Sequence, residues 1–348
     1  MNNTFLKACR GEKTKYTPIW IMRQAGRYLP QYQKVRGKVD FLTLCKTPEL
    51  AAEVTIQPID ILKVDAAILF SDILIPVEAM GMKLEFFEKR GPVLSPAVRD
   101  ENTVKKLSVP DPEDRMRFVM DTIRLLRKEL KNRAPLIGFS GAPFTTATYM
   151  IEGGTSKNFL NTKRMLFQSP ELYRSLMDKV TDTVTEYLKA QIKAGAQAVQ
   201  LFDTWAGVFS PPDYKEYALP YVIQVIKELK KWQESEKLNV PVIYFVGETA
   251  GLLEEIKKSG ADVYGIDWRI NLDSAIKRIG KNAVVQGNLD PISLFLPHDK
   301  IEQRVKDILQ RASSAKGHVF NLGHGILPET PPESAIALVE LVHKLSKS

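Results

Sequence analysis

The sequence contains little cysteine, and this limits the sites it can build. Among 348 residues there are two cysteines, Cys9 and Cys45, and no CxxC pair. Neither a disulfide framework nor a thiolate metal site is encoded, and a reducing, cytoplasmic setting is expected. The four histidines all lie late in the chain, at His298, His318, His324 and His343. None belongs to an HExxH motif or has zinc-ligand spacing, so we expect no protein-bound metal.

Long apolar runs and phosphate-binding glycine loops are also missing. No uninterrupted apolar run reaches the roughly 18 residues that span a bilayer, and the first residues lack the apolar core of a signal peptide. We therefore expect a protein that is neither exported nor embedded in a membrane. GxxxxGKS/T, GxGxxG and GxSxG do not occur, which argues against nucleotide-dependent transfer, dinucleotide redox chemistry and serine hydrolysis.

Positive charge is in excess. Lysine plus arginine number 49 against 41 aspartate plus glutamate, a formal net charge of +8. Such a net field attracts anions without specifying which ones, so nucleic acid, a membrane surface and a small polyacid all remain open. The lysines are spread along predicted helices and form no stripe with stacking aromatic residues, which disfavours nucleic acid.

Eight short runs rich in valine, isoleucine and phenylalanine predict the strands. The runs are residues 18–22, 66–70, 135–141, 198–204, 242–247, 262–267, 283–290 and 318–325. Continuous apolar runs suit strands that are covered on both faces of a parallel sheet. Eight alternations with amphipathic stretches favour an α/β fold with a single (β/α)8 TIM-type barrel over residues 1–348, rather than a doubly wound open sheet.

Helical periodicity predicts helices over residues 114–133 and 170–193, and a closing helix over residues 335–347. Ser169 is expected to cap the second of these, with Pro170 in its first turn.

Residues 84–98 break the alternation of strands and helices. Their Arg90-Gly91-Pro92 turn lies between two apolar runs. We expect a hairpin inserted after the second strand.

Polar residues at the strand ends are the candidate site. Loops after the strands of a barrel meet at one face, so these residues become neighbours although they are far apart in the sequence. They are Arg23, Arg27, Ser71, Asp72, Ser140, Gly141, Asp203, Thr204, Glu248, Asp267, Asn288, Asp290 and His324, with Tyr149 in the segment that follows Ser140.

Each candidate also has a purely structural interpretation. Asp72 is equally suited to cap the next helix, and Asp203 and Asp267 to satisfy loop amides. Tyr149 alone is typical of a packing residue, and His324 of a hydrogen-bonded structural imidazole. The two arginines between Pro18 and Tyr32 are compatible with two solvated surface side chains or with an anion site, because guanidinium groups stay charged and offer forked donors to carboxylates or phosphates.

Seven ordered motifs resemble the uroporphyrinogen decarboxylase family over nearly the whole sequence. They are PIWIMRQAGRYLPQY at Pro18, FSDIL at Phe70, GFSGAPFTTATYMIEGG at Gly138, LFDTWAG at Leu201, GIDW at Gly265, QGNLDP at Gln286 and NLGHGI at Asn321. Two positions vary from those common in the family: Thr204, often Ser, and Phe144, where Trp also occurs.

The resemblance implies a carboxy-lyase of haem biosynthesis that converts uroporphyrinogen III to coproporphyrinogen III and four CO2, as a homodimer with facing clefts. No metal or organic cofactor is implied, and no nucleic-acid or membrane partner. Substrate-binding residues carried over from the family are Arg23, Gln24, Ala25, Gly26, Arg27, Asp72, Tyr149, Thr204 and His324. Asp72, Tyr149 and His324 are also the catalytic candidates, with Asp72 facing the pyrrole N–H groups and stabilising a cationic intermediate.

Two points stay open at this stage. The proton donor is Tyr149, His324 or a bound water more readily than arginine, a very weak acid that has nevertheless been considered in this family. The alternative function is a corrinoid- or zinc-linked methyltransferase of the same barrel superfamily, which would need Cys and His ligands that the sequence does not group together.

Overall fold

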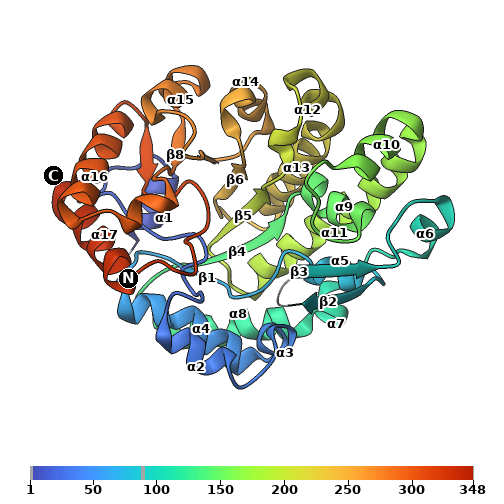
Figure 1. Cartoon of the computed structure of the whole chain (residues 1–348), viewed down its shortest axis with the longest axis horizontal. Coiled ribbons are helices and arrows are strands. Elements are labelled where there is room, and N and C mark those ends of the chain that lie inside the picture. Colours follow the sequence, from blue (N-terminus) through green and yellow to red (C-terminus); the bar gives the residue numbers. More distant parts are fainter. Residues whose placement is uncertain (1–2, 88–90, 348) are drawn as a thin grey trace.

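A curled parallel sheet forms the centre of the computed structural model, which describes residues 3–87 and 91–347. Within these residues seven strands pair in the order β1-β4-β5-β6-β7-β8-β9, each with its neighbour in parallel. Helices surround the strands (Figure 1). The strands are β1 (Ala67–Ile68), β4 (Leu136–Gly141), β5 (Ala198–Asp203), β6 (Val242–Val246), β7 (Val263–Gly265), β8 (Val284–Gln286) and β9 (Gly317–Val319). The predicted α/β barrel architecture is confirmed, with a difference at its first strand.

The helices alternate with these strands along the chain. They are α1 (Thr4–Cys9), α2 (Pro30–Arg36), α3 (Phe41–Lys46), α4 (Pro48–Ile61), α5 (Ile75–Ala79), α6 (Glu101–Lys106), α7 (Pro112–Arg115), α8 (Arg117–Leu130), α9 (Pro143–Glu152), α10 (Leu160–Gln168), α11 (Pro170–Ala194), α12 (Pro211–Tyr217), α13 (Leu219–Ser235), α14 (Leu253–Ile256), α15 (Leu272–Ile279), α16 (His298–Ala312) and α17 (Pro332–Leu345), with the 3-10 helices η1 (Ala206–Val208), η2 (Thr249–Gly251), η3 (Lys257–Ser259) and η4 (Pro291–Phe295). In residues 3–87 and 91–347, no helix combines the length and apolar character needed to cross a bilayer.

The first predicted strand, residues 18–22, forms only a single parallel bridge, between Ile19 and Phe320. Side-chain oxygens accept hydrogen bonds from most of its backbone N–H groups. Few of these N–H groups therefore pair with the backbone of a neighbouring strand. Ile19 N donates to Asp65 Oδ2 (2.9 Å), Ile21 N to Gln24 Oε1 (3.0 Å) and Met22 N to Asn321 Oδ1 (3.0 Å). Because Asp65 also donates its backbone N–H to Ile19 O (2.8 Å), this segment joins the β1 side of the sheet to the β9 side. We call residues 18–22 the seam.

The strands and their long helix bury the apolar runs as predicted. Every residue of β4 and of β6 is buried, as expected for strands covered on both faces. Along α11, Leu176, Val180 and Val184 are buried on one face, and Leu172 packs against the same core while partly exposed. Pro170 is the first residue of α11 and Ser169 occupies the N-cap position, as predicted, but the Ser169 side chain makes no capping hydrogen bond.

The helix predicted over residues 114–133 is divided in two. α7 ends at Arg115 and α8 begins at Arg117, because Met116 adopts φ −129° and ψ 30°. The Met116 side chain is fully buried. Burial of this residue overrides the local helical preference, which sequence periodicity alone does not reveal.

Two further strands, β2 (Lys83–Phe87) and β3 (Gly91–Ser95), pair antiparallel at one side of the barrel (Figure 1). Phe87 is opposite Gly91 in this pair. Arg90 of the predicted turn lies outside the described residues.

Candidate active site

A large open cavity lies at the carboxyl ends of the strands and has a volume of about 950 Å³. Its wall includes loops after β1 and β5, the middle and end of α2, and the pair β2 and β3. All nine residues that the sequence analysis assigned to substrate contribute to the wall: Arg23, Gln24, Ala25, Gly26, Arg27, Asp72, Tyr149, Thr204 and His324. The fold thus brings together residues separated by as many as 300 positions in the sequence.

The arginine loop begins where the seam ends. Arg23 has φ 64°, a left-handed conformation that is uncommon for a residue with a side chain. The buried Gln24 side chain fixes the loop, because its Nε2 donates to Ala66 O (3.0 Å) while its Oε1 accepts from Ile21 N. Arg23 and Arg27 are both exposed. Gln24 therefore anchors a loop whose two guanidinium groups remain available to a ligand.

Arg23 also packs directly over Gly325. A Cβ atom at Gly325 would overlap the Cδ, Nε and Cγ atoms of Arg23. The glycine after His324 is needed for this close approach, and it brings the arginine loop against the loop that follows β9.

Asp72 combines a structural contact with a role in the cavity wall. Its Oδ1 accepts a hydrogen bond from Leu74 N (2.8 Å), but the N-cap residue of α5 is Leu74 itself, without a side-chain capping bond, so the alternative interpretation of Asp72 as the cap of the next helix is wrong. Burial raises the pKa of Asp72 to about 6, while the Leu74 bond and the Arg23 charge act in the opposite direction. At neutral pH the carboxylate is mainly ionised but poorly solvated, a state that favours contact with a cation or with N–H donors.

Tyr149 and His324 are also changed by burial. Burial raises the pKa of Tyr149, with the Asp72 charge adding to the effect, so the phenol keeps its proton at neutral pH. Burial lowers the pKa of His324 to about 4, and the charges of Arg23 and Arg269 act in the same direction. His324 is therefore a neutral imidazole at pH 7, able both to donate and to accept a hydrogen bond.

Aromatic rings make up much of the remaining wall. The Tyr149 ring stacks on Trp205 with the ring centroids 3.8 Å apart. Other aromatic residues in the wall are Tyr28, Tyr32, Phe41, Phe70, Phe86, Phe87, Phe139 and Phe202. An apolar wall with charged groups at a few places suits a large, flat ligand that carries acidic groups at its edge.

A sequence profile described as Uroporphyrinogen decarboxylase (URO-D) matches residues 1–345. Curated relatives of that name agree: the one from Geobacter sulfurreducens is 57% identical over 347 residues, which cover 100% of each chain. The relative from Desulfotalea psychrophila is 57% identical, covering 99% of each chain. That from Carboxydothermus hydrogenoformans is 52% identical, covering 99% of this chain and 97% of the relative. The chain belongs to the uroporphyrinogen decarboxylase family.

Solved structures described as a methyltransferase and as a methionine synthase share the fold of this chain. A methyltransferase from Methanosarcina mazei superposes with a TM-score of 0.82 at 20% identity, covering 99% of this chain and 98% of that one. A B12-independent methionine synthase from Shewanella sp. W3-18-1 gives a TM-score of 0.59 at 13% identity, covering 88% and 91%. At these identities the likeness concerns the barrel alone.

Within residues 3–87 and 91–347, no group of three or more His, Cys, Asp or Glu side chains is placed to hold a metal ion. Cys9 and Cys45 are both buried as free thiols. Burial raises the pKa of the Cys45 thiol, and a protonated thiol is a poor metal ligand.

Arg36 also lies in the cavity wall, but the sequence analysis did not predict it. It closes α2, and its Nη1 donates to Val39 O (2.6 Å). The signal that could have revealed Arg36 is its spacing: it lies four residues after Tyr32 on one helix, so both point to one side. The cavity thereby has three arginines in its wall.

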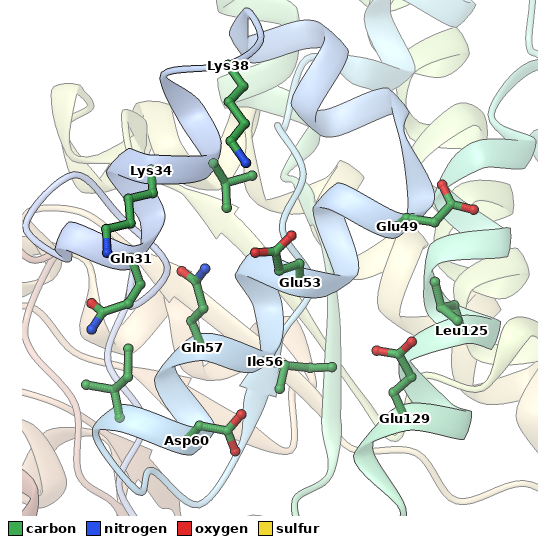
Figure 2. Close-up of a pocket in the computed structure, with 12 residues that line it drawn as sticks. Gln31, Lys34, Lys38, Glu49, Glu53, Ile56, Gln57, Asp60, Leu125 and Glu129 are labelled. Carbon is green, nitrogen blue, oxygen red and sulfur yellow. The ribbon is translucent and has the colours of Figure 1, made fainter.

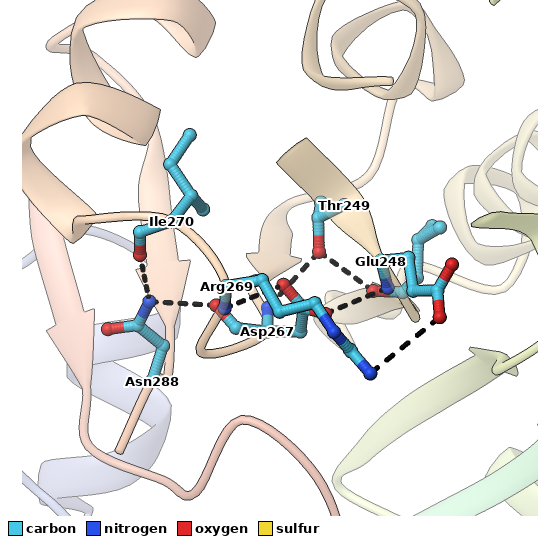
Figure 3. A network of polar contacts seen from close by, with 7 residues as sticks. Glu248, Thr249, Asp267, Arg269, Ile270 and Asn288 are labelled. Atoms are coloured by element: carbon cyan, nitrogen blue, oxygen red, sulfur yellow. Dashed lines mark hydrogen bonds and ion pairs between the residues drawn. The ribbon is translucent and has the colours of Figure 1, made fainter. Parts of the chain in front are cut away.

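Three predicted strand-end residues, Glu248, Asp267 and Asn288, form a separate network outside the cavity wall (Figure 3). Asp267 is fully buried, and its Oδ2 accepts from Glu248 N (2.8 Å) and Arg269 Nη1 (2.6 Å). Asn288 Nδ2 donates to the carbonyl oxygens of Asp267 (2.8 Å) and Ile270 (2.7 Å). The structural interpretation of Asp267, that it satisfies loop amides, is confirmed.

A second hollow lies on the outside of the barrel, between α2, α4 and α8 (Figure 2). It has a volume of about 760 Å³ and contains none of the predicted site residues. Lys34 on α2 and Lys38, just after α2, lie across from Glu53 on α4 (Figure 2). Its open, mixed-charge surface offers no convergent set of groups for chemistry.

Proposed function

We propose that this chain removes the carboxyl groups of the four acetate side chains of uroporphyrinogen III, giving coproporphyrinogen III and four CO2. As a uroporphyrinogen decarboxylase family member it is a carboxy-lyase of porphyrin biosynthesis. The observation that carries the detailed proposal is the placement of a poorly solvated carboxylate, Asp72, in a cavity with three arginines in its wall.

Substrate carboxylates are assigned to the arginines. The substrate carries eight carboxylates, and each charge-assisted hydrogen bond to a guanidinium contributes about 1.5 to 3 kcal/mol. Arg23 and Arg27 are exposed at the cavity, and Arg36 adds a third positive group. In this proposal Ala25 and Gly26 contribute backbone N–H groups, while the Gln24 side chain holds the loop rather than the substrate.

The ring of the substrate accepts the electrons that decarboxylation releases. A proton adds to the pyrrole carbon beside the acetate-bearing carbon and converts the ring to an iminium cation. The bond from the acetate CH2 to its carboxylate then breaks, CO2 leaves, and the bonding electrons neutralise the cation. A proton adds to the exocyclic carbon, giving methyl, and the ring proton is lost. Overall, one proton is taken up for each CO2 released. The pyrrole ring of the substrate itself accepts the electrons of the broken bond.

Asp72 is the group suited to stabilise that cation. A fixed carboxylate directed at the pyrrole N–H groups interacts more strongly as positive charge develops, so it favours the transition state over the ground state. Its burial strengthens this interaction, because water does not screen it.

Tyr149, Thr204 and His324 are assigned to substrate binding. Burial raises the pKa of Tyr149 and makes its phenol a weaker acid, and burial lowers the pKa of His324 to about 4, so at pH 7 it is a neutral imidazole without the additional proton of an imidazolium. Both are therefore better suited to hydrogen bonding than to proton donation at neutral pH. The Thr204 hydroxyl adds a further polar contact in the cavity wall.

The function is tested with purified protein and uroporphyrinogen III under anaerobic conditions with a metal chelator. We expect coproporphyrinogen III and four CO2 for each substrate, measured by chromatography of the oxidised porphyrins. Absence of coproporphyrinogen would contradict the proposal. Activity that disappears with chelator and returns with zinc would favour a metal-dependent reaction instead.

A homodimer with facing cavities is proposed on the resemblance, with support from apolar side chains exposed after β8. Ile292 is 55% exposed and Phe295 44% exposed, both on η4. We expect sedimentation equilibrium of the wild-type protein to give twice the 39.3 kDa chain mass. The double variant Ile292→Asp, Phe295→Asp should give the mass of a single chain. Phe167→Asp on α10, where Phe167 is 58% exposed, is the control and should remain dimeric. A monomeric wild-type protein would refute the dimer.

The remaining assignments of the sequence analysis are proposals of the same kind. We propose one domain over residues 1–348, a cytoplasmic location, and a net charge that serves an acidic small molecule rather than nucleic acid. The two buried free thiols support a reducing compartment. Limited proteolysis, fractionation of cells and nucleic-acid retention at moderate salt are the respective measurements.

A further inference from the structure

A buried carboxylate behind the cavity joins four separate elements. Asp203, the last residue of β5, is fully buried and does not belong to the cavity wall. Its Oδ1 accepts from Thr145 Oγ1 on α9 (2.6 Å), and its Oδ2 accepts from Tyr244 OH on β6 (2.8 Å). The Tyr214 hydroxyl on α12 lies 2.8 Å from that of Tyr244. Because Tyr244 uses its only proton on the carboxylate, Tyr214 is the donor between the two.

The network continues from Asp203 toward the cavity through Thr145. Trp205 N donates to Thr145 Oγ1 (3.2 Å), so one threonine hydroxyl ties α9 to the loop after β5. On α9, Tyr149 lies one turn after Thr145 and faces the same side. The Tyr149 ring stacks on Trp205 with centroids 3.8 Å apart and planes 28° from parallel. The position of Tyr149 is thus fixed by α9 and by the Trp205 ring. Both α9 and Trp205 are connected to Asp203 through hydrogen bonds of Thr145.

The position of Thr204 also depends on contacts of Asp203. It follows Asp203 directly in the chain, and Gly247 N donates to Asp203 O (3.2 Å). Gly247 lies so close beneath Thr204 that a Cβ atom there would overlap the Thr204 carbonyl. The loop after β5 therefore has little freedom to shift relative to β6.

We propose that Asp203 is a positioning residue for this cavity: through Thr145 and Trp205 it fixes where the Tyr149 ring and the Thr204 hydroxyl meet the substrate. The inference rests on the proposed function for its substrate, but the geometry that it describes exists without substrate. Two hydroxyl donors satisfy the carboxylate, and burial alone would otherwise make it costly. A displacement of about 1 Å at such a contact can cost about a hundredfold in rate.

The test compares two substitutions that each remove one hydroxyl from the same carboxylate. Thr145→Val breaks the link to α9 and Trp205, whereas Tyr244→Phe leaves that link in place. Thr145→Ser restores the hydroxyl. Thr122→Val on α8 is the control for losing a buried threonine hydroxyl, because Thr122 Oγ1 bonds only its own helix at Phe118 O (2.7 Å). For each protein we would measure thermal unfolding, near-ultraviolet circular dichroism without substrate, and kcat and KM for uroporphyrinogen III.

Thr145→Val is expected to lose the dichroism of the Tyr149–Trp205 stack and to lower kcat/KM by about tenfold or more. Thr145→Ser should recover both, while Tyr244→Phe and Thr122→Val should keep the dichroism and stay within about twofold of wild-type kcat/KM despite reduced stability. A Thr145→Val protein with wild-type dichroism would overturn the proposal. The proposal would also fail if Thr145→Val and Tyr244→Phe both lost kcat/KM in the same proportion as they lost thermal stability. The dichroism needs no substrate, so failure of the proposed function would not be mistaken for failure of the positioning role.

Discussion

Replacing Asp72 with alanine or asparagine is expected to lower kcat by a factor of about 100 to 1,000 while the protein remains folded. The reason is the loss of a fixed negative charge where positive charge develops, and comparable preorganised groups contribute about 3 to 4 kcal/mol to a transition state. Asp72→Asn keeps the shape and leaves an oxygen able to accept the Leu74 N–H, so its activity separates charge from structure. Steady-state kinetics with uroporphyrinogen III measures the effect.

Asp290 provides the matched control for this experiment. Its Oδ1 accepts from Ile292 N (3.1 Å), the same spacing of two residues as the Asp72 contact, but it does not belong to the cavity wall. Asp290→Asn should therefore change kcat little. Wild-type kcat in Asp72→Asn would exclude a role for the charge.

The pH dependence follows from the same carboxylate. Because the pKa of Asp72 is raised to about 6, this residue gains a proton as the pH falls through that value, and kcat/KM should decline there. Above that value the carboxylate is charged and active. The decline should be missing from what activity Asp72→Asn retains.

Replacing Arg23 or Arg27 with alanine is expected to raise KM about 10- to 100-fold, with a smaller effect on kcat. Each substitution removes charge-assisted hydrogen bonds of about 1.5 to 3 kcal/mol to substrate carboxylates, and these exist before as well as during the reaction. Initial rates over a range of uroporphyrinogen concentrations measure KM. Arg174→Ala on α11 removes the same charge from an exposed position outside the cavity wall and should leave KM unchanged.

Gly325→Ala tests the position of Arg23 without changing any charge. The new Cβ atom would take the space of the Arg23 side chain and push the guanidinium away. We expect a rise in KM that approaches that of Arg23→Ala. If KM stays at the wild-type value in Arg23→Ala, Arg27→Ala and Gly325→Ala, the arginine loop does not bind the substrate.

The sequence predicted where the candidate residues would meet, but not what most of them would contact. Strand ends converge by topology, so Asp72, Thr204 and His324 could be placed together from eight apolar runs alone. Asp267 has the same strand-end position, yet its partners are amides and a guanidinium of neighbouring loops. Strand-end position alone does not distinguish Asp267 from Asp72, because the difference lies in which loop is folded over each carboxylate.

Local patterns were also overruled where long-range contacts decided the outcome. Residues 18–22 read as a strand, but the acceptors of Ile19 and Met22 are side chains that lie 46 and 299 positions away. Met116 interrupts a helical pattern because its side chain is buried in the core. Arg36 escaped attention because it lies on a helix rather than at a strand end. In each case the missing information was tertiary.

The seam has a thermodynamic consequence for ligand binding. It joins the two sides of the sheet through side-chain bonds of Asp65, Gln24 and Asn321 together with backbone bonds, and it leads directly into Arg23. Because the seam continues into the arginine loop, local opening of the barrel along this line would also release that loop. In the proposed function, substrate carboxylates bind the arginine loop only while the barrel is closed at the seam. Substrate binding therefore stabilises the barrel against local opening at the seam.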